Sequence, residues 1–291
     1  MISKRSFSAV IFIGVSTVLP LLAQGPPPPM PPQALDPLVA RIALYPDPLL
    51  AQILAAATFP DQISPAAMWA DQHHYLTGQA LANAITGDQL PWDPSVQALL
   101  PFPSVLDMMA SDMNWTGQLG NASMVQQQDV MDAVQRSRHQ AQQYGYLRSN
   151  PQVVVGGGPY ITIMPVDPGL IYVPYYDPAI VFFPPRAGFF VGGAIRFNFG
   201  IGIGGFFAPW GWGYNRFDWG GHAVFINNAR WNRTWNNRAT YVHPYQVPRY
   251  EPGRARPAEQ HRLESRTPTE RAAPRQGRGR VEEHGGKGER R

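Results

Sequence analysis

The segment LDPLVARIALYPDPLLAQILAAATFP, residues 35–60, contains two Asp-Pro pairs, and each pair is followed by apolar residues at helical spacing. An aspartate at a helix N-cap accepts hydrogen bonds from the free N–H groups of the first turn. Proline is tolerated at the next position, because its missing N–H would have no partner within the helix. The pair Asp93-Pro94 repeats the arrangement before another apolar run. We therefore predict that Asp36, Asp47 and Asp93 are helix N-caps rather than catalytic carboxylates.

The residues around this segment extend the helical pattern into a lobe that covers residues 35–148. Apolar side chains recur at helical spacing after Ser64, after Thr77 and over residues 103–111. A short helix over residues 114–119 should break near Gly120, and the longest helix should cover residues 124–144. We predict several short helices packed around that long one, in a lobe of about 110 residues, which is an ordinary domain size.

After Arg148 the pattern changes from helical spacing to short β-branched runs. PQVVV, PYITIMP and GLIYVPYYDP occupy most of residues 149–183, for which we predict a β-hairpin region. Asp167-Pro168-Gly169 lies between two isoleucines, Ile163 and Ile171, and is typical of a hairpin turn. The expected fold class is α+β, with the helical lobe first and the β-hairpin region after it.

Residues 184–248 are rich in glycine and aromatic residues. Three structures fit this composition: a small, flexible β subdomain packed against the helical lobe, a weakly ordered sheet, or a glycine-rich apolar hairpin inserted into a membrane. Arg196 and Asn198 interrupt the apolar run that the membrane hairpin needs. Three glycines of this region, Gly200, Gly202 and Gly205, match the dinucleotide-loop spacing, but no helix pattern follows them, which argues against a dinucleotide site.

Four long motifs of the chain occur together in one known family. LVARIALYPDPLLAQILAAATFP, PWDPSVQALLPFPSVLDMMASDMNWTGQLG, QQQDVMDAVQRSRHQAQ and IYVPYYDP resemble the domain-of-unknown-function 3300 family of exported bacterial proteins. The resemblance covers roughly residues 35–176. It implies a bacterial envelope protein with a signal peptide, and it implies no catalytic residues, because the family has no established activity.

The N-terminal residues predict export. Lys4 and Arg5 precede an apolar run of about 16 residues, which is typical of a secretory signal peptide over residues 1–23 and short for a bilayer-spanning helix. A retained membrane anchor is the alternative. The next segment, residues 24–34, contains GPPPPMPP and predicts a disordered Pro-rich tether. The chain has no cysteine, so it has no disulfide and no site for diacylation.

Charge is distributed unevenly along the chain. Residues 36–148 carry ten Asp against four Arg, whereas residues 249–291 carry eleven Arg and one Lys against seven Glu. The second segment has few apolar residues, and we predict a disordered Arg-rich tail there. Such a tail could contact an anionic lipid surface peripherally or fold back weakly on the acidic lobe.

Two aromatic stretches are candidate binding surfaces. The first is the YVPYYDP motif with Tyr172, Tyr175, Tyr176 and Asp177, and the second interleaves arginine with tryptophan at Arg230, Trp231, Arg233, Trp235 and Arg238. Stacked aromatic rings and guanidinium groups suit nucleic-acid bases in a cytosolic protein. For an exported chain we expect no nucleic acid, and the same groups suit sugar rings and phosphates. A solvated edge strand and loop is the alternative for the second stretch.

No enzyme motif is present. The chain lacks H-E-x-x-H, G-x-S-x-G, a P-loop and a cysteine nucleophile, and all its glutamates lie in the tail. His73 and His74 are adjacent on a predicted helix end and cannot easily face one metal together, even with Asp71. We therefore assign no catalytic residue, metal ligand or cofactor. We expect a non-enzymatic envelope module, in the periplasm or at the cell surface, that contacts an anionic polymer, a glycan or a protein partner. The alternative is an envelope hydrolase with two aspartates converging in a cleft.

Overall fold

The computed structural model describes residues 25–186, 188 and 191–248. The predicted signal peptide and the predicted Arg-rich tail lie outside the described residues. The helices are α1 (Pro32–Val39), α2 (Asp47–Ala56), α3 (Pro60–Gln72), α4 (Gly78–Gly87), α5 (Pro94–Gln97), α6 (Pro103–Ser111), α7 (Met113–Val125), α8 (Gln127–Gln143) and α9 (Pro178–Val181), with two 3-10 turns at Val191–Gly193 and Ala208–Trp210. This order confirms the predicted α+β class, with a helical lobe followed by small antiparallel sheets.

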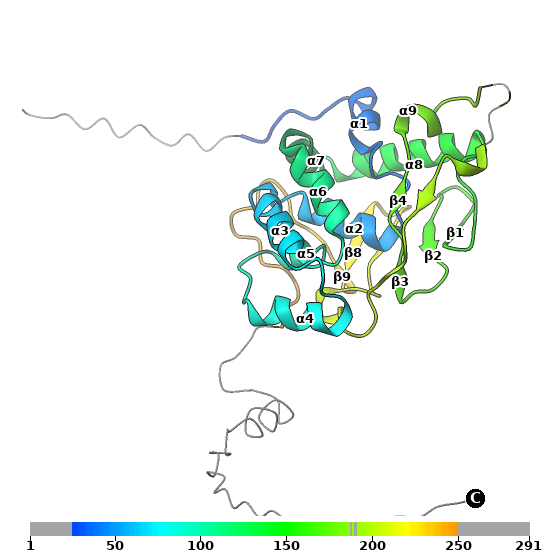
Figure 1. The fold of residues 1–291 in the computed structure, drawn as a ribbon. Helices are drawn as coiled ribbons and strands as arrows, with labels where there is room; N and C mark the ends of the chain where they lie inside the picture. The colour runs from blue at the N-terminus through cyan, green and yellow to red at the C-terminus, as the bar shows by residue number, and fades with distance from the viewer. Residues whose placement is uncertain (1–24, 187, 189–190, 249–291) are drawn as a thin grey trace, which may run out of the picture. The chain divides into compact units, whose positions relative to one another are not determined.

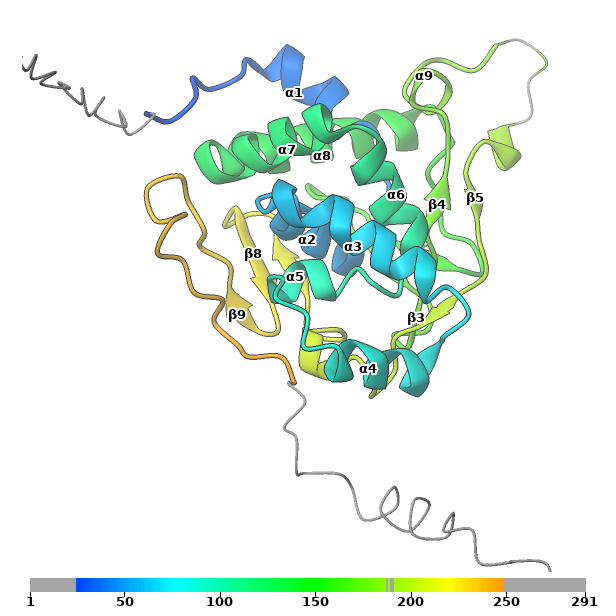
Figure 2. The same ribbon diagram turned by 60° about the vertical axis from the view of Figure 1, so that its left-hand side comes forward.

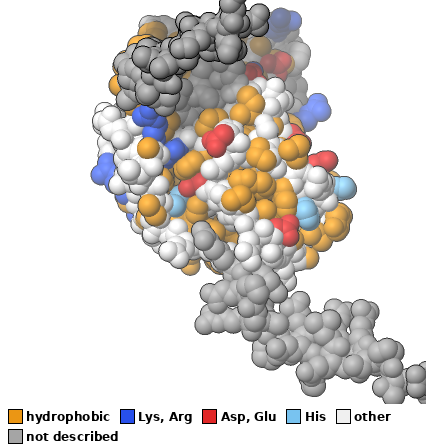
Figure 3. Space-filling view, turned by 90° about the vertical axis from the view of Figure 1, so that its left-hand side faces the viewer, with side chains coloured by type: hydrophobic (Ala, Val, Ile, Leu, Met, Phe, Trp, Pro, Cys, Tyr) orange, Lys and Arg blue, Asp and Glu red, His pale blue; other side chains and the backbone are white. Residues whose placement is uncertain are grey.

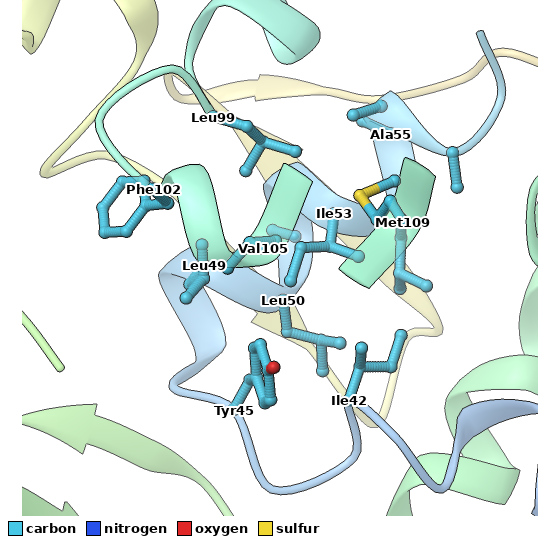
Figure 4. Packing of buried hydrophobic residues seen from close by; sticks show 14 of the residues in the cluster. Ile42, Tyr45, Leu49, Leu50, Ile53, Ala55, Leu99, Phe102, Val105 and Met109 are labelled. Carbon is cyan, nitrogen blue, oxygen red and sulfur yellow. The ribbon is translucent and has the colours of Figure 1, made fainter. Parts of the chain in front are cut away.

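Helix α2 lies at the centre of the hydrophobic core, and all of its residues are buried. It contacts α5 and α7 among the helices and β2, β7 and β8 among the strands. In Figures 1 and 2 it lies between the other helices of the lobe and the strands. Figure 4 shows Leu50 and Ile53 of α2 among side chains from α6, including Val105 and Met109. The apolar run that follows Asp47-Pro48 therefore forms a helix that is covered on every side.

The strands form four small antiparallel sheets. Their bounds are β1 (Val153–Val155), β2 (Ile163–Pro165), β3 (Leu170–Ile171), β4 (Pro174–Tyr175), β5 (Arg196–Phe197), β6 (Ile201–Gly202), β7 (Arg216–Asp218), β8 (Ala223–Ile226) and β9 (Ala229–Arg230). The pairs are β1 with β2, β3 with β6, and β4 with β5, and the last three strands form a sheet in the order β7-β8-β9.

The predicted hairpin between Ile163 and Ile171 is wrong. Ile163 pairs with Val155 of β1, and Ile171 pairs with Ile201 of β6, so the two isoleucines belong to different sheets. Asp167 does form the predicted turn, since its side chain accepts a hydrogen bond of 2.8 Å from the Gly169 N–H. The turn connects two sheets rather than two strands of one hairpin.

Only one of the three predicted caps is confirmed. The Asp93 carboxylate accepts a hydrogen bond of 2.9 Å from the Ser95 N–H at the start of α5. Asp36 lies inside α1, whose N-cap is Pro31, and its side chain pairs with Arg136 at 2.5 Å instead. Asp47 is the first residue of α2 and makes no capping hydrogen bond, because its buried carboxylate is engaged by distant residues.

Two further helix boundaries differ from the prediction. We expected a break near Gly120, but helix α7 continues through this residue to Val125. A Cβ atom at Gly120 would collide with the carbonyl oxygen of Ala57, so this glycine permits a close approach between α7 and the end of α2. The longest helix, α8, begins at Gln127, three residues later than predicted.

The predicted disordered tether is ordered at its C-terminal end. The backbone of Met30 forms two hydrogen bonds with the Gln126 side chain. The Met30 N–H donates to the amide oxygen at 2.6 Å, and the Met30 carbonyl oxygen accepts from the amide nitrogen at 3.0 Å. Helix α1 then begins at Pro32, inside the predicted tether. Within the described part of the chain, no helix is both long enough and apolar enough to cross a membrane.

The Gly- and aromatic-rich region packs against the helical lobe. Trp210 and Trp212 are buried, and their indole N–H groups donate to the Gln97 side chain and the Ala98 carbonyl oxygen, both at 3.0 Å. Trp231 is buried as well. These contacts agree with the β subdomain that we considered, and they place three large aromatic side chains in the same core as the helices.

Candidate binding groove

Tyr176 is a fixed wall of the candidate site. Its hydroxyl donates a hydrogen bond of 2.8 Å to the Ala40 carbonyl oxygen and accepts one of 3.3 Å from the Leu44 N–H. Its ring meets Tyr45 and Phe182 edge to face, with centroid distances of 6.4 and 6.1 Å. Burial raises the pKa of Tyr176 well above its usual value. The hydroxyl is therefore a neutral structural group. It joins the end of strand β4 to the loop between α1 and α2.

Tyr175 points the other way. It is 50% exposed, whereas the side chains on either side of it, Pro174 and Tyr176, are buried and half-buried. In the β4–β5 pair it lies directly opposite Arg196. Residues directly opposite in an antiparallel pair have Cβ atoms about 4.5–5.5 Å apart on one face of the sheet. The two exposed side chains therefore project from adjacent positions on the same face of the pair.

Two open hollows adjoin each other at these tyrosines, and we call the combined feature the tyrosine groove. The smaller hollow has a volume of about 310 Å³ and is lined by Arg41, Tyr45, Ser104, Met108, Val173, Pro174, Tyr175, Tyr176 and Pro178. The larger has a volume of about 600 Å³ and is lined by Tyr175, Tyr176, Asp177, Ile180, Gly193, Ala194 and Arg196. Both hollows are lined by Tyr175 and Tyr176, so these two residues lie where the hollows meet, and we call them the tyrosine ridge.

The charged groups of the groove differ in how they are engaged. Arg41 pairs with Asp112 at 3.0 Å, and the N–H of Trp115 and this guanidinium group hold the pKa of Asp112 below its usual value. Asp177 caps α9, since one of its oxygens accepts a hydrogen bond of 2.8 Å from the Ala179 N–H. Arg196 makes no ion pair with any carboxylate in the described part of the chain.

The predicted residues of the YVPYYDP motif divide between the groove and its support. Tyr175, Tyr176 and Asp177 line the larger hollow. Tyr172 lines neither hollow; its half-buried ring covers Gly200, where a Cβ atom would lie 2.9 Å from the ring. Asp177 caps helix α9, which lies inside the region for which we predicted β-hairpins.

The arginine- and tryptophan-rich stretch is mainly a structural element, which we call the aromatic strap (residues 231–248). Trp231 is buried, and the Arg233 guanidinium group donates to the Thr58 carbonyl oxygen while it covers the Phe59 ring at 3.7 Å. Arg238 stacks over Trp235 at 3.7 Å. Arg230, just before the strap, is exposed. Of the candidate surface residues in this stretch, Trp231 and Arg233 are therefore buried, whereas Arg230 is open to solvent.

From the sequence alone, neither of the two arginines of the groove could be assigned to it. Arg41 lies in the loop between α1 and α2, and Arg196 lies in a glycine-rich run about 20 residues after the tyrosines. Arg196 reaches the groove only through the pairing of β5 with β4. Arg196 could have been picked out as a cation within the glycine-rich run. Its position beside β4 could not have been predicted from the sequence.

Another hollow, of about 550 Å³, lies between α3, α4 and β6. Its lining is mostly apolar and includes His73, His74 and Phe206.

The face in Figure 3 shows hydrophobic side chains gathered at its centre with carboxylates among them, while Lys and Arg side chains lie toward its upper edge. Among the described residues, no group of three or more His, Cys, Asp or Glu could hold a metal ion.

Four aspartates of the helical lobe have partners that account for them structurally. Asp47 pairs with Arg138 and Asp93 caps α5. Asp132 lies 2.9 Å from the His222 ring, and Asp88 accepts a hydrogen bond of 2.7 Å from the Trp69 indole. The groove itself contains one carboxylate, Asp177, in its described lining. The described lining therefore does not present the two facing carboxylates of the common glycoside hydrolases.

Comparison with known proteins agrees with the resemblance seen in the motifs. The family model described as "Protein of unknown function (DUF3300)" matches residues 31–250. The chain belongs to this family. The "Uncharacterized protein YacH" of Escherichia coli (strain K12) is 33% identical over 216 residues, which cover 58% of this chain and 35% of that protein. The chain therefore spans about a third of the length of this relative. No solved structure matches the chain.

Proposed function

We propose that this DUF3300 protein is a non-enzymatic module that binds an extended surface polymer in the tyrosine groove. One observation carries the proposal: the exposed ring of Tyr175 stands on a rigid ridge between two open hollows that adjoin at its base. An extended chain can lie across such a ridge and place one unit in each hollow. Tyr176 keeps the ridge rigid through its hydrogen bonds to the α1–α2 loop. A preorganised site lowers the entropy lost on binding.

The proposed setting is the bacterial cell envelope. Its support is the basic and apolar N-terminal sequence, which is typical of a secretory signal, together with the resemblance to exported proteins. A polymer of that compartment, an anionic lipid surface or an envelope protein would be the accessible partner. Among these we favour a polymer, because the groove is open at both hollows and lined by aromatic, proline and arginine side chains.

The alternative hydrolase has less support. Asp177 is the one carboxylate in the described lining of the groove, and its capping hydrogen bond to Ala179 explains its position. A hydrolase would need a second acid or base opposite it. The Tyr176 hydroxyl does not supply a base, because burial raises its pKa and backbone groups of the α1–α2 loop take both of its hydrogen bonds.

The test is binding of the full chain to a panel of soluble polysaccharides, measured by retardation in native affinity gels and by calorimetry. We expect Tyr175→Ala to weaken binding about tenfold or more, because the exposed ring supplies the stacking surface. Tyr214→Ala is the matched control, since Tyr214 is 51% exposed and lies outside the groove. Equal binding by the Tyr175 variant and the wild type would overturn the proposal. Release of reducing ends from a bound polymer would favour the hydrolase.

A further inference from the structure

The larger hollow of the tyrosine groove combines three chemically different groups. Tyr175 offers an exposed ring, Arg196 offers a guanidinium group on the same face of the β4–β5 pair, and Asp177 offers a carboxylate at the start of α9. The pairing of Tyr175 with Arg196 is set by backbone register, so their separation does not depend on a flexible loop. A ligand that contacts the ring is therefore within reach of the cation.

Arg196 is the available cation of this hollow. The guanidinium group of Arg41, in the smaller hollow, is already paired with Asp112, whereas Arg196 is exposed and has no carboxylate partner in the described residues. A guanidinium group presents donors in a fork that matches a carboxylate or a phosphate. An anionic group on the ligand would find its partner at Arg196.

Asp177 limits the kind of anion that fits. One of its oxygens accepts the Ala179 N–H, which leaves the other free to accept hydrogen bonds from a ligand. A densely charged ligand would be repelled by this carboxylate. A sugar ring with hydroxyl groups and one acidic group satisfies all three contacts: its hydroxyls donate to Asp177, its face packs on Tyr175, and its acid binds Arg196.

We infer that the tyrosine groove is specific for an acidic glycan, and that Arg196 is the residue that binds the acidic group of this glycan. This inference rests on the proposed function and adds the ligand class to it. The shared chemistry is a sugar polymer with one carboxylate or phosphate group on each unit or on alternate units. Nothing in the inference requires the Arg-rich tail, so charge recognition by Arg196 can be separated from binding by the tail.

The experiment compares one polymer in two charge states. Polygalacturonate carries a carboxylate on each sugar, and its fully methyl-esterified form keeps the same backbone without the charge. A phosphorylated mannan distinguishes phosphate from carboxylate as the source of the anion. Vesicles with anionic lipids test whether a charged surface without sugar is sufficient. Each probe is titrated against the full chain at low and at physiological salt, where exposed charges are screened beyond about 8 Å.

The variants separate the charge from the stacking surface. We expect the wild type to bind the acid form about tenfold tighter than the ester, and Arg196→Gln to bind both forms as weakly as the wild type binds the ester. Arg196→Lys should keep part of the preference. Arg230→Gln is the matched control, because Arg230 is also an exposed strand arginine and lies outside the groove. Circular dichroism and thermal midpoints confirm that each variant is folded.

Three results would overturn the inference. The first is an Arg196→Gln variant that keeps the full preference for the acid form. The second is loss of that preference in Arg230→Gln or in a chain truncated after Pro248, which would place the charge recognition elsewhere. The third is binding to anionic vesicles that depends on Arg196 as strongly as polymer binding does. The proposed function survives all three, since it is tested separately, by the effect of Tyr175→Ala on polymer binding and by the release of reducing ends.

Discussion

Arg138 and Asp47 form an ion pair of 2.6 Å whose two side chains are 0% and 4% exposed. The guanidinium group also donates to the carbonyl oxygens of Ala43, Tyr45 and Ile161 at 2.8, 3.0 and 2.8 Å. These partners come from the α1–α2 loop and the strand region, while Arg138 itself comes from α8. The pair therefore ties the helical lobe to the first sheet at the point where α2 begins.

The environment of Asp47 makes removal of one partner costly. Its second oxygen accepts a hydrogen bond of 3.2 Å from the Trp219 indole, and the Arg138 guanidinium group lies 4.9 Å from that ring. Burial raises the pKa of Asp47, and Arg138 and the hydrogen bonds oppose this rise. We predict that Asp47→Ala or Arg138→Ala lowers the free energy of unfolding by about 3–5 kcal/mol, because either change leaves an unpaired buried charge. Urea unfolding followed by tryptophan fluorescence measures the loss.

Two comparisons test whether burial is the cause. The exposed pair Asp36–Arg136 has a similar distance of 2.5 Å, and its removal by Asp36→Ala should cost about 1 kcal/mol or less. The double variant Asp47→Leu with Arg138→Met should lose much less than the sum of the two single alanine changes, since no charge is then left in the core. A strictly additive double variant would contradict this account.

The cap at Asp93 gives a second prediction. Asp93→Ala should lower the free energy of unfolding by about 0.5–2 kcal/mol, because the Ser95 N–H loses its partner, and Asp93→Asn should be nearly neutral. Thermal unfolding of the three proteins compares them directly. A loss in the asparagine variant as large as that in the alanine variant would show that the charge near His243, and not the cap, is what matters.

The five Asp-Pro pairs show what local sequence can and cannot predict. Asp93 and Asp177 cap short helices, and Asp167 makes a turn, so these three are explained by their immediate neighbours. The cap prediction for Asp36 fails because α1 starts earlier, at Pro32, where another proline occupies a favourable first position. The cap prediction for Asp47 fails because its carboxylate pairs with Arg138, which is about 90 residues away in the sequence. This ion pair engages the carboxylate in place of a capping N–H.

The sheets and the groove depend on pairings that the sequence does not specify locally. β3 pairs with β6 and β4 pairs with β5, across a segment that contains α9 and a glycine-rich run. Short strands of two residues carry no alternation long enough to fix a register. The tyrosines of the groove were found from their composition, whereas Arg196 could be added only when the β4–β5 register was known.

Two glycines of α7 provide a third prediction with an internal control. A Cβ atom at Gly120 would collide with the Ala57 carbonyl oxygen, whereas nothing lies within 4 Å of a Cβ atom at Gly117. Gly120→Ala should therefore destabilise the protein by about 1–3 kcal/mol or more, because the backbone of α7 must move away from the end of α2. Gly117→Ala should stabilise it by about 0.5–1 kcal/mol through its better helix propensity. Denaturant midpoints that shift in the same direction for both variants would contradict the close approach of α7 to α2.

The aromatic strap holds a buried histidine that should make the fold sensitive to acid. His243 is 9% exposed, and neither ring nitrogen has a hydrogen-bond partner among the described residues. Asp93 lies 3.7 Å from its Nε2 atom, and the rings of Tyr241 and Tyr245 lie 5.9 and 4.4 Å away. Burial lowers the pKa of His243 below its usual value of 6.5, and the Asp93 carboxylate offsets this only in part. The folded state therefore holds a neutral imidazole in a site that does not accommodate its charged form.

The sign of the pH effect follows from this shift. Above about pH 6.5 the histidine is neutral in both the folded and the unfolded chain, so its contribution to stability is fully present. Below that pH the unfolded chain binds the proton first, and stability is lost at up to about 1.4 kcal/mol per pH unit until the pH passes the folded pKa. Urea midpoints of the wild type should fall between pH 7.5 and 5.5, those of His243→Gln should fall less, and those of His139→Gln, an exposed control, should follow the wild type. Parallel curves for wild type and His243→Gln would show that the strap histidine is not the titrating group. The pKa of Asp112 is lowered from its usual value of 3.8, so its titration lies outside the pH range of this comparison.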